Sequence, residues 1–143
     1  MNRIQKISWF FVINISLAFL VSLAAVGLMY LKYGTSKALI GFCFMGLAGI
    51  SGLAPLFFKE DKGPVVRDER DKLIHIRSAW SGFACSYLVM GLACMVPFSI
   101  LGPKATISIG WLPNIFMAGG ITLFFVYSLA ILVQYGKGDS EHE

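Results

Sequence analysis

Charged residues are absent from four long stretches of the chain, and this pattern predicts the architecture. The stretches are residues 7–31, 38–58, 78–103 and 105–136. An apolar helix of about 20 residues crosses the roughly 30 Å hydrocarbon core of a bilayer, so each stretch is long enough to span it. The pattern therefore predicts an all-α membrane protein with four transmembrane helices.

The polar and helix-breaking residues between these stretches set the expected limits of the helices. The expected spans are residues 9–30, 38–58, 79–101 and a fourth that ends near Gln134. Gly34 is the expected turn residue of the first loop, and Pro113 suits the first turn of the fourth helix. Residues 136–143 are polar, and we expect them to form a flexible tail. The whole chain, 1–143, then forms one four-helix transmembrane domain.

The first apolar stretch has some features of a signal peptide, because Arg3 and Lys6 precede it. Its uncharged run of 25 residues is much longer than the 7–15 apolar residues of a usual signal core. We therefore interpret residues 9–30 as a helix that is retained.

Composition and charge agree with a membrane protein and indicate its orientation. Hydrophobic residues make up 57% of the chain, and the formal net charge is +4. Nine of the twelve Lys and Arg residues lie in the N-terminal segment, the second loop or the tail. Cytoplasmic loops are enriched in Lys and Arg, so both termini and the second loop are expected in the cytoplasm. Cations at helix ends meet lipid headgroups, and no nucleic-acid partner is expected.

The second loop, residues 59–77, carries most of the charge and ends in a predicted helix. Opposite charges lie four residues apart, and acids near the helix start suit the helix dipole. Without a helix breaker before residue 79, this helix is expected to extend the third span into the cytoplasm. The candidate interaction surface comprises Arg67, Asp68, Glu69, Arg70, Asp71, Lys72, His75 and Arg77.

Part of this loop, "DERDKLIHIRSAW", resembles a segment found in a family of small prokaryotic four-span membrane proteins of uncharacterised function. That segment reads D-E-R-x-x-x-I-x-x-K/R and precedes the third span. The matching positions here are Asp68, Glu69, Arg70, Ile74 and Arg77. The resemblance implies a multi-pass protein of a prokaryotic inner membrane, and it implies no chemistry. Genes of such proteins are often neighbours of helix-turn-helix regulators, which favours a regulatory role.

Small residues recur at helical spacing in the second and third spans, where they allow another helix to approach closely. In the second span, Ala48 and Gly52 lie four residues apart and predict one smooth face. We expect that span to pack through its Gly46–Gly49–Gly52 face, against another span or a second copy of the chain. The candidate packing residues are Gly46, Ala48, Gly49, Gly52, Ser78, Gly82 and Ser86.

Residues that could carry chemistry are few. No ionisable side chain lies within the uncharged stretches, which argues against proton-coupled transport. Asn14 is expected to bond a neighbouring helix, as are the hydroxyls of Tyr87 and Tyr127. His75 is interpreted as a solvated residue on the helix surface, with a ligand or quinone contact as the alternative. No catalytic set, metal site or cofactor site is expected, and a disulfide between Cys43, Cys85 and Cys94 is not expected either.

The sequence therefore favours a non-enzymatic membrane protein that acts by association, as a subunit or regulatory partner of a membrane or cytosolic protein. Its expected partners are the lipid bilayer and either further copies of the chain or another membrane protein. The alternative is a small transporter or channel whose polar pathway forms only in an oligomer. Such a pathway would be lined by Asn14, Ser51, Ser86 or Asn114.

Overall fold

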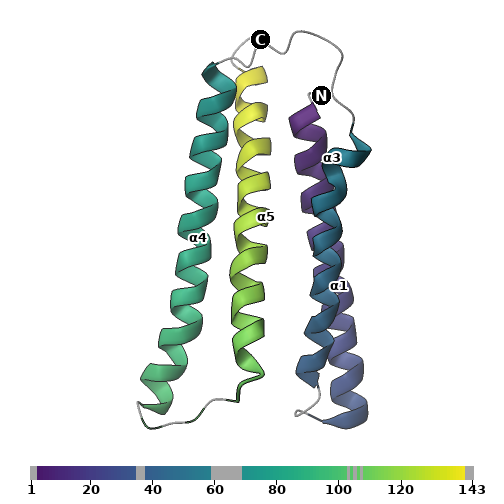
Figure 1. The fold of residues 1–143 in the computed structure, drawn as a ribbon, viewed down its shortest axis with the longest axis vertical. Coiled ribbons are helices and arrows are strands. Elements are labelled where there is room, and N and C mark those ends of the chain that lie inside the picture. Colours follow the sequence, from purple (N-terminus) through teal and green to yellow (C-terminus); the bar gives the residue numbers. More distant parts are fainter. Residues whose placement is uncertain are drawn as a thin grey trace. The chain divides into compact units, whose positions relative to one another are not determined.

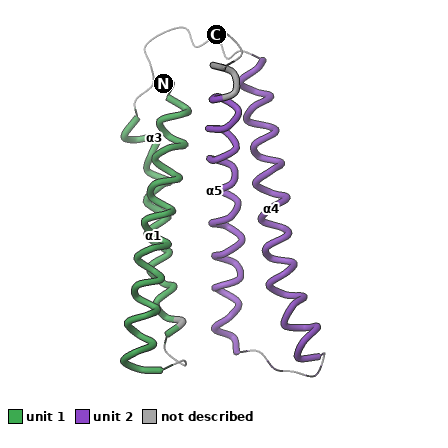
Figure 2. Tube along the Cα trace, turned by 180° about the vertical axis from the view of Figure 1, so that it is seen from behind, with its two compact units in different colours: residues 1–66, 139–143 green, residues 67–138 purple. Residues whose placement is uncertain are grey.

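The computed structural model describes residues 3–34, 38–58, 69–102, 104, 106 and 108–140. These residues are all-helical apart from turns and connections (Figure 1). They form two compact units, of which the first contains α1, η1 and α3 and the second contains α4 and α5 (Figure 2). Three of the helices are long and apolar enough to cross a membrane, and a shorter apolar helix accompanies them. The predicted all-helical fold is thus confirmed, and the three long apolar helices are consistent with a membrane protein.

The first long helix, α1, runs from Arg3 to Tyr33. Its end is a glycine cap: Gly34 has a φ of 75°, and its amide donates a hydrogen bond to the carbonyl of Tyr30 at 3.0 Å. Glycine adopts this left-handed conformation without a steric penalty. Gly34 is therefore the turn residue that the sequence predicts.

The second apolar stretch differs from a regular α-helix. It forms a 3₁₀ helix, η1, over Leu39–Leu53, followed by the short α-helix α3 over Ala54–Phe57, with Pro55 in its first turn. At about 2.0 Å per residue, fifteen 3₁₀ residues extend roughly 30 Å, close to the thickness of a bilayer core. So many 3₁₀ residues in one run are uncommon, and the residue pattern repeats every three positions.

From Met45 onward, η1 has three faces, because a 3₁₀ helix has three residues per turn. The buried residues Met45 and Ser51 lie on one face, which continues to the buried Ala54 at the start of α3. Leu47, Ile50 and Leu53 form an exposed apolar face. The third face carries Cys43, Gly46, Gly49 and Gly52, all of them exposed. The expected pairing of Ala48 with Gly52 on one smooth face is therefore wrong, because residues four apart do not share a face of η1.

Contacts between α1 and η1 hold the first unit together. Asn14 donates from Nδ2 to Oγ of Ser51 at 2.8 Å, and it lies within 3.3 Å of the carbonyl of Leu47. Gly41 is a point of close approach between the two helices, since a Cβ built there would lie 2.6 Å from the backbone nitrogen of Val26. The predicted helix–helix hydrogen bond of Asn14 is thus confirmed.

The second unit is an antiparallel pair of helices, α4 over Glu69–Leu101 and α5 over Trp111–Ser140 (Figure 1). Pro97 lies inside α4, and Gly102 ends that helix with a φ of 79° and an amide bonded to the carbonyl of Phe98. The helix α5 is helical through Ser140, so the first five residues of the predicted flexible tail belong to it. Residues 141–143 lie outside the described part of the chain.

Candidate functional site

The charged segment enters the described structure at Glu69, the first residue of α4, so Arg67 and Asp68 lie outside it. The helix is continuous from Glu69 into the apolar span, which confirms the predicted extension of that span for these residues. Glu69 and Asp71 lie in the first turn, where carboxylates interact favourably with the positive end of the helix dipole. One continuous helix therefore carries both the charged residues and the apolar stretch.

Two titratable side chains at the start of α4 face α5 and are hydrogen-bonded to it. The hydroxyl of Tyr135 donates to a carboxylate oxygen of Asp71 at 2.6 Å. Nδ1 of His75 and the hydroxyl of Tyr127 share a hydrogen bond of 2.7 Å. Both Asp71 and His75 are half-buried. These two bonds attach the first turns of α4 to α5.

Further along the helix pair, small residues of α4 allow α5 to come close. The buried residues of α4 are Ile74, Ser78, Gly82 and Ser86, each four positions after the last. Ser86 donates to the carbonyl of Gly119 at 2.8 Å, and Gln134 donates to the hydroxyl of Ser78 at 3.0 Å. A Cβ on Gly82 would lie 2.8 Å from the carbonyl oxygen of Leu123. Ser78, Gly82 and Ser86 thus lie at the contact between α4 and α5.

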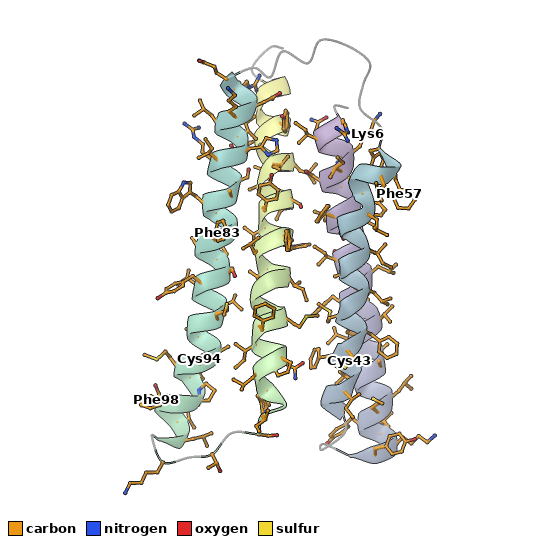
Figure 3. All side chains as sticks on the ribbon, viewed as in Figure 1. Lys6, Cys43, Phe57, Phe83, Cys94 and Phe98 are labelled. Carbon is orange, nitrogen blue, oxygen red and sulfur yellow. The ribbon has the colours of Figure 1, made fainter. Side chains whose placement is uncertain are left out.

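The opposite face of α4 is exposed, and apolar and charged residues are mixed on it. Leu73, Ile76 and Trp80 follow each other at helical spacing and are 52%, 54% and 73% exposed. Phe83 continues this exposed apolar row toward the middle of the helix and is labelled in Figure 3. The exposed charges around the row are Glu69, Arg70, Lys72 and Arg77. We call Glu69, Arg70, Lys72, Leu73 and Ile76 the outer face of α4.

The structure describes six of the eight residues of the candidate interaction surface, and these six are divided between two sides of α4. Glu69, Arg70, Lys72 and Arg77 are exposed, whereas Asp71 and His75 contact α5. The interpretation of His75 as a solvated residue is wrong, because the antiparallel pairing places Tyr127 beside it. Tyr127 makes the predicted bond to a neighbouring helix, whereas Tyr87 is 82% exposed.

The contributions of Gln134 and Tyr135 were missed from the sequence. The sequence signal for these two residues is that they are polar groups at the end of the fourth apolar run. The polar residues of the second loop stand likewise at the start of the third apolar run. The pairing of Asp71 with Tyr135 depends on the register of two antiparallel helices, and residue spacing within one helix does not determine that register.

Three of the four glycines of η1 lie away from the contact with α1. At Gly46, Gly49 and Gly52, a built Cβ has no heavy atom within 4 Å. Ala48, in contrast, is half-buried, and its carbonyl lies 3.4 Å from Nδ2 of Asn14. The close approach within the first unit is made at Gly41, one of the glycines of the second span that was not selected as a packing residue.

Metal-ligating and thiol groups are dispersed over the described residues. In that part of the chain, no three His, Cys, Asp or Glu side chains come together as a metal site. Cys43 and Cys94 are exposed, Cys85 is half-buried, and all three are free thiols. The arrangement at the start of α4 therefore offers hydrogen bonding, charge and apolar surface for binding.

The chain was compared with protein families, curated proteins and solved structures. No protein-family model, curated protein or solved structure matches the chain. The resemblance of residues 68–77 to a family of small prokaryotic membrane proteins therefore stays a prediction.

Proposed function

We propose that the chain is a non-enzymatic integral membrane protein that acts by association, as a subunit or regulatory partner, and that the outer face of α4 is its contact surface. The supporting observation is that this face is exposed while the opposite side of the same helix is bonded to α5. The charges of the outer face are therefore available to another molecule without breaking the helix pair.

The residue mixture on the outer face suits a protein partner. Leu73 and Ile76 are half-exposed apolar side chains between charged neighbours. An amphipathic helix of this kind binds by laying its apolar residues into a groove on a partner. Covering the exposed half of each side chain would contribute roughly 1 kcal/mol, and the surrounding charges would select the partner.

The transporter or channel alternative receives less support from the polar side chains that would line its pathway. Asn14 and Ser51 bond each other, Ser86 bonds the carbonyl of Gly119, and Asn114 bonds the carbonyl of Gly110. Each of these side chains already has a partner within its own unit. Hydrating them would require these hydrogen bonds to be exchanged for bonds to water.

In the proposed topology, four helical segments cross a cell membrane, and η1 together with α3 forms the second of them. Both termini and the start of α4 then lie in the cytoplasm. We expect Lys72→Cys and Lys104→Cys, each in a background without Cys43, Cys85 and Cys94, to differ in labelling by an impermeant thiol reagent on intact cells. Both lysines are exposed, and both variants lose one positive charge. Labelling at 104 alone is expected from the positive-inside rule; equal labelling at both positions contradicts the orientation.

The contact surface is tested by the double variant Glu69→Lys with Arg70→Glu. The net charge is kept, and both side chains are exposed, so membrane insertion and thermal stability are expected to stay within about 0.5 kcal/mol of wild type. Co-purification of the partner should fall at least tenfold, because the order of charges on the face is inverted. Tyr87→Leu, which changes an exposed side chain well inside the span, serves as the control and should leave co-purification unchanged.

Two results would count against the proposal. If the double variant unfolds, the segment is structural. If it retains the partner as well as Tyr87→Leu does, the contact surface lies elsewhere on the chain.

A further inference from the structure

Arg77 differs from the other described cations of α4 in its surroundings. It is exposed, and neither residues 73–81 of α4 nor residues 125–134 of α5 contain Asp or Glu. Asp71, at the start of α4, accepts a hydrogen bond from the hydroxyl of Tyr135 on the side of the helix that faces α5. The guanidinium of Arg77 therefore has no carboxylate at its own level of the helix pair.

The position of Arg77 along α4 matches a membrane surface. Trp80 lies three residues further along, is 73% exposed and neighbours Arg77 on the helix surface. Tyr127 of α5 lies at the same level, since it bonds His75 and would contact a side chain at Gly82. Trp and Tyr concentrate where the apolar core of a bilayer meets the headgroups. From Trp80 to Leu101 the helix contains no charged residue, which provides the length needed to cross the core.

A second cation shares this side of the helix. Arg70 precedes Arg77 by seven residues, which is about two helical turns and about 10 Å along the axis. Both side chains are exposed. An arginine fork binds phosphate oxygens in a bidentate manner, and Arg70 would lie above Arg77 at the outer edge of the headgroup layer.

We infer that Arg77, with Trp80 below it and Arg70 above it, forms a binding site for the headgroup of an anionic phospholipid in the leaflet that meets the start of α4. The phosphate is held by the guanidinium of Arg77, and the indole of Trp80 packs against the upper part of the acyl chains. This inference needs only that α4 crosses a bilayer. It does not depend on the proposed protein partner.

The test uses the full chain purified in detergent and offered equal amounts of phosphatidylglycerol and phosphatidylcholine with identical acyl chains. Native mass spectrometry then measures the ratio of the two lipids retained. Wild type should retain phosphatidylglycerol in excess, and Arg77→Gln should lower that excess about fivefold, as expected for one cation at a membrane surface. The preference of wild type should also fall as salt rises.

Two further variants separate a local site from general attraction. Arg77→Lys keeps the charge but lacks the bidentate fork, so its preference should lie between those of wild type and Arg77→Gln. Lys104→Gln removes an exposed cation beyond the other end of α4 and should change nothing. The inference is overturned if wild type shows no preference, if the preference is insensitive to salt, or if Arg77→Gln behaves as wild type. An equal loss in Arg77→Gln and Lys104→Gln would also overturn it. Because no partner protein is present, failure here leaves the proposed function standing.

Discussion

Replacing Gly41 by alanine should destabilise the chain more than any other glycine-to-alanine change within η1. The added Cβ would lie 2.6 Å from the backbone nitrogen and 2.8 Å from the Cα atom of Val26. Both atoms belong to the backbone of α1, so the two helices must separate to admit the methyl group. Overpacking of this kind costs about 1–3 kcal/mol. Thermal unfolding of the detergent-solubilised protein measures the effect.

Gly46→Ala is the matched control for that change. It adds the same methyl group to the same helix, at a position where a Cβ meets no heavy atom within 4 Å. Alanine restricts the unfolded chain, so this variant should be neutral or slightly more stable than wild type. If Gly41→Ala unfolds at the same temperature as Gly46→Ala, then α1 and η1 do not make the contact described above.

The second large effect is expected from Gly82→Ala, which acts on the contact between α4 and α5. The new Cβ would lie 2.8 Å from the carbonyl oxygen of Leu123 and 3.3 Å from Cβ of Tyr127. Pushing Tyr127 away also strains its 2.7 Å hydrogen bond to His75. The change should therefore cost about 1–3 kcal/mol and loosen the attachment of the charged turns to α5.

Hydrogen exchange at the start of α4 gives a readout that reports this loosening. Amides of residues 72–78 should exchange faster in Gly82→Ala than in wild type, because local opening of the helix pair becomes easier. Gly91→Ala is the control within the same helix, since a Cβ there meets no heavy atom within 4 Å. Equal exchange in both variants would show that Gly82 does not hold α4 against α5.

The sequence predicts those features that depend on one helix at a time. The uncharged stretches identify the apolar helices, and the lack of a breaker between Glu69 and the third span predicts the continuous helix α4. The αL cap at Gly34 follows from glycine in a short polar loop. The cost of an unsatisfied amide among apolar residues predicts that Asn14 bonds a neighbouring helix, whereas its partner, Ser51, is identified only by the structure.

Features that depend on the pairing of helices were harder to predict. The bonds from Asp71 to Tyr135 and from His75 to Tyr127 require the register of α4 against α5, which the pattern of either helix alone leaves open. For the same reason the sequence placed His75 in solvent, although a tyrosine lies beside it.

The 3₁₀ form of η1 was missed for a different reason. Ala48 and Gly52, four residues apart, were assigned to one face as in an α-helix, and the Gly46–Gly49–Gly52 face was predicted for packing without its spacing being taken as a sign of a 3₁₀ helix. The spacing of three that relates Gly46, Gly49 and Gly52 was already visible in the sequence. It matches the three residues per turn of the observed helix.

The most direct test of the proposed contact surface places a photoreactive amino acid at Ile76 in the full-length protein, in cells. Tyr87 provides the control position, since it lies on the same exposed side of α4 about three turns further into the span. Association through the outer face predicts a discrete protein crosslink from position 76 that disappears in the Glu69→Lys, Arg70→Glu background, and no such product from position 87. A crosslink from position 76 that survives the charge reversal, or the absence of any protein product at that position, would contradict the proposed contact surface.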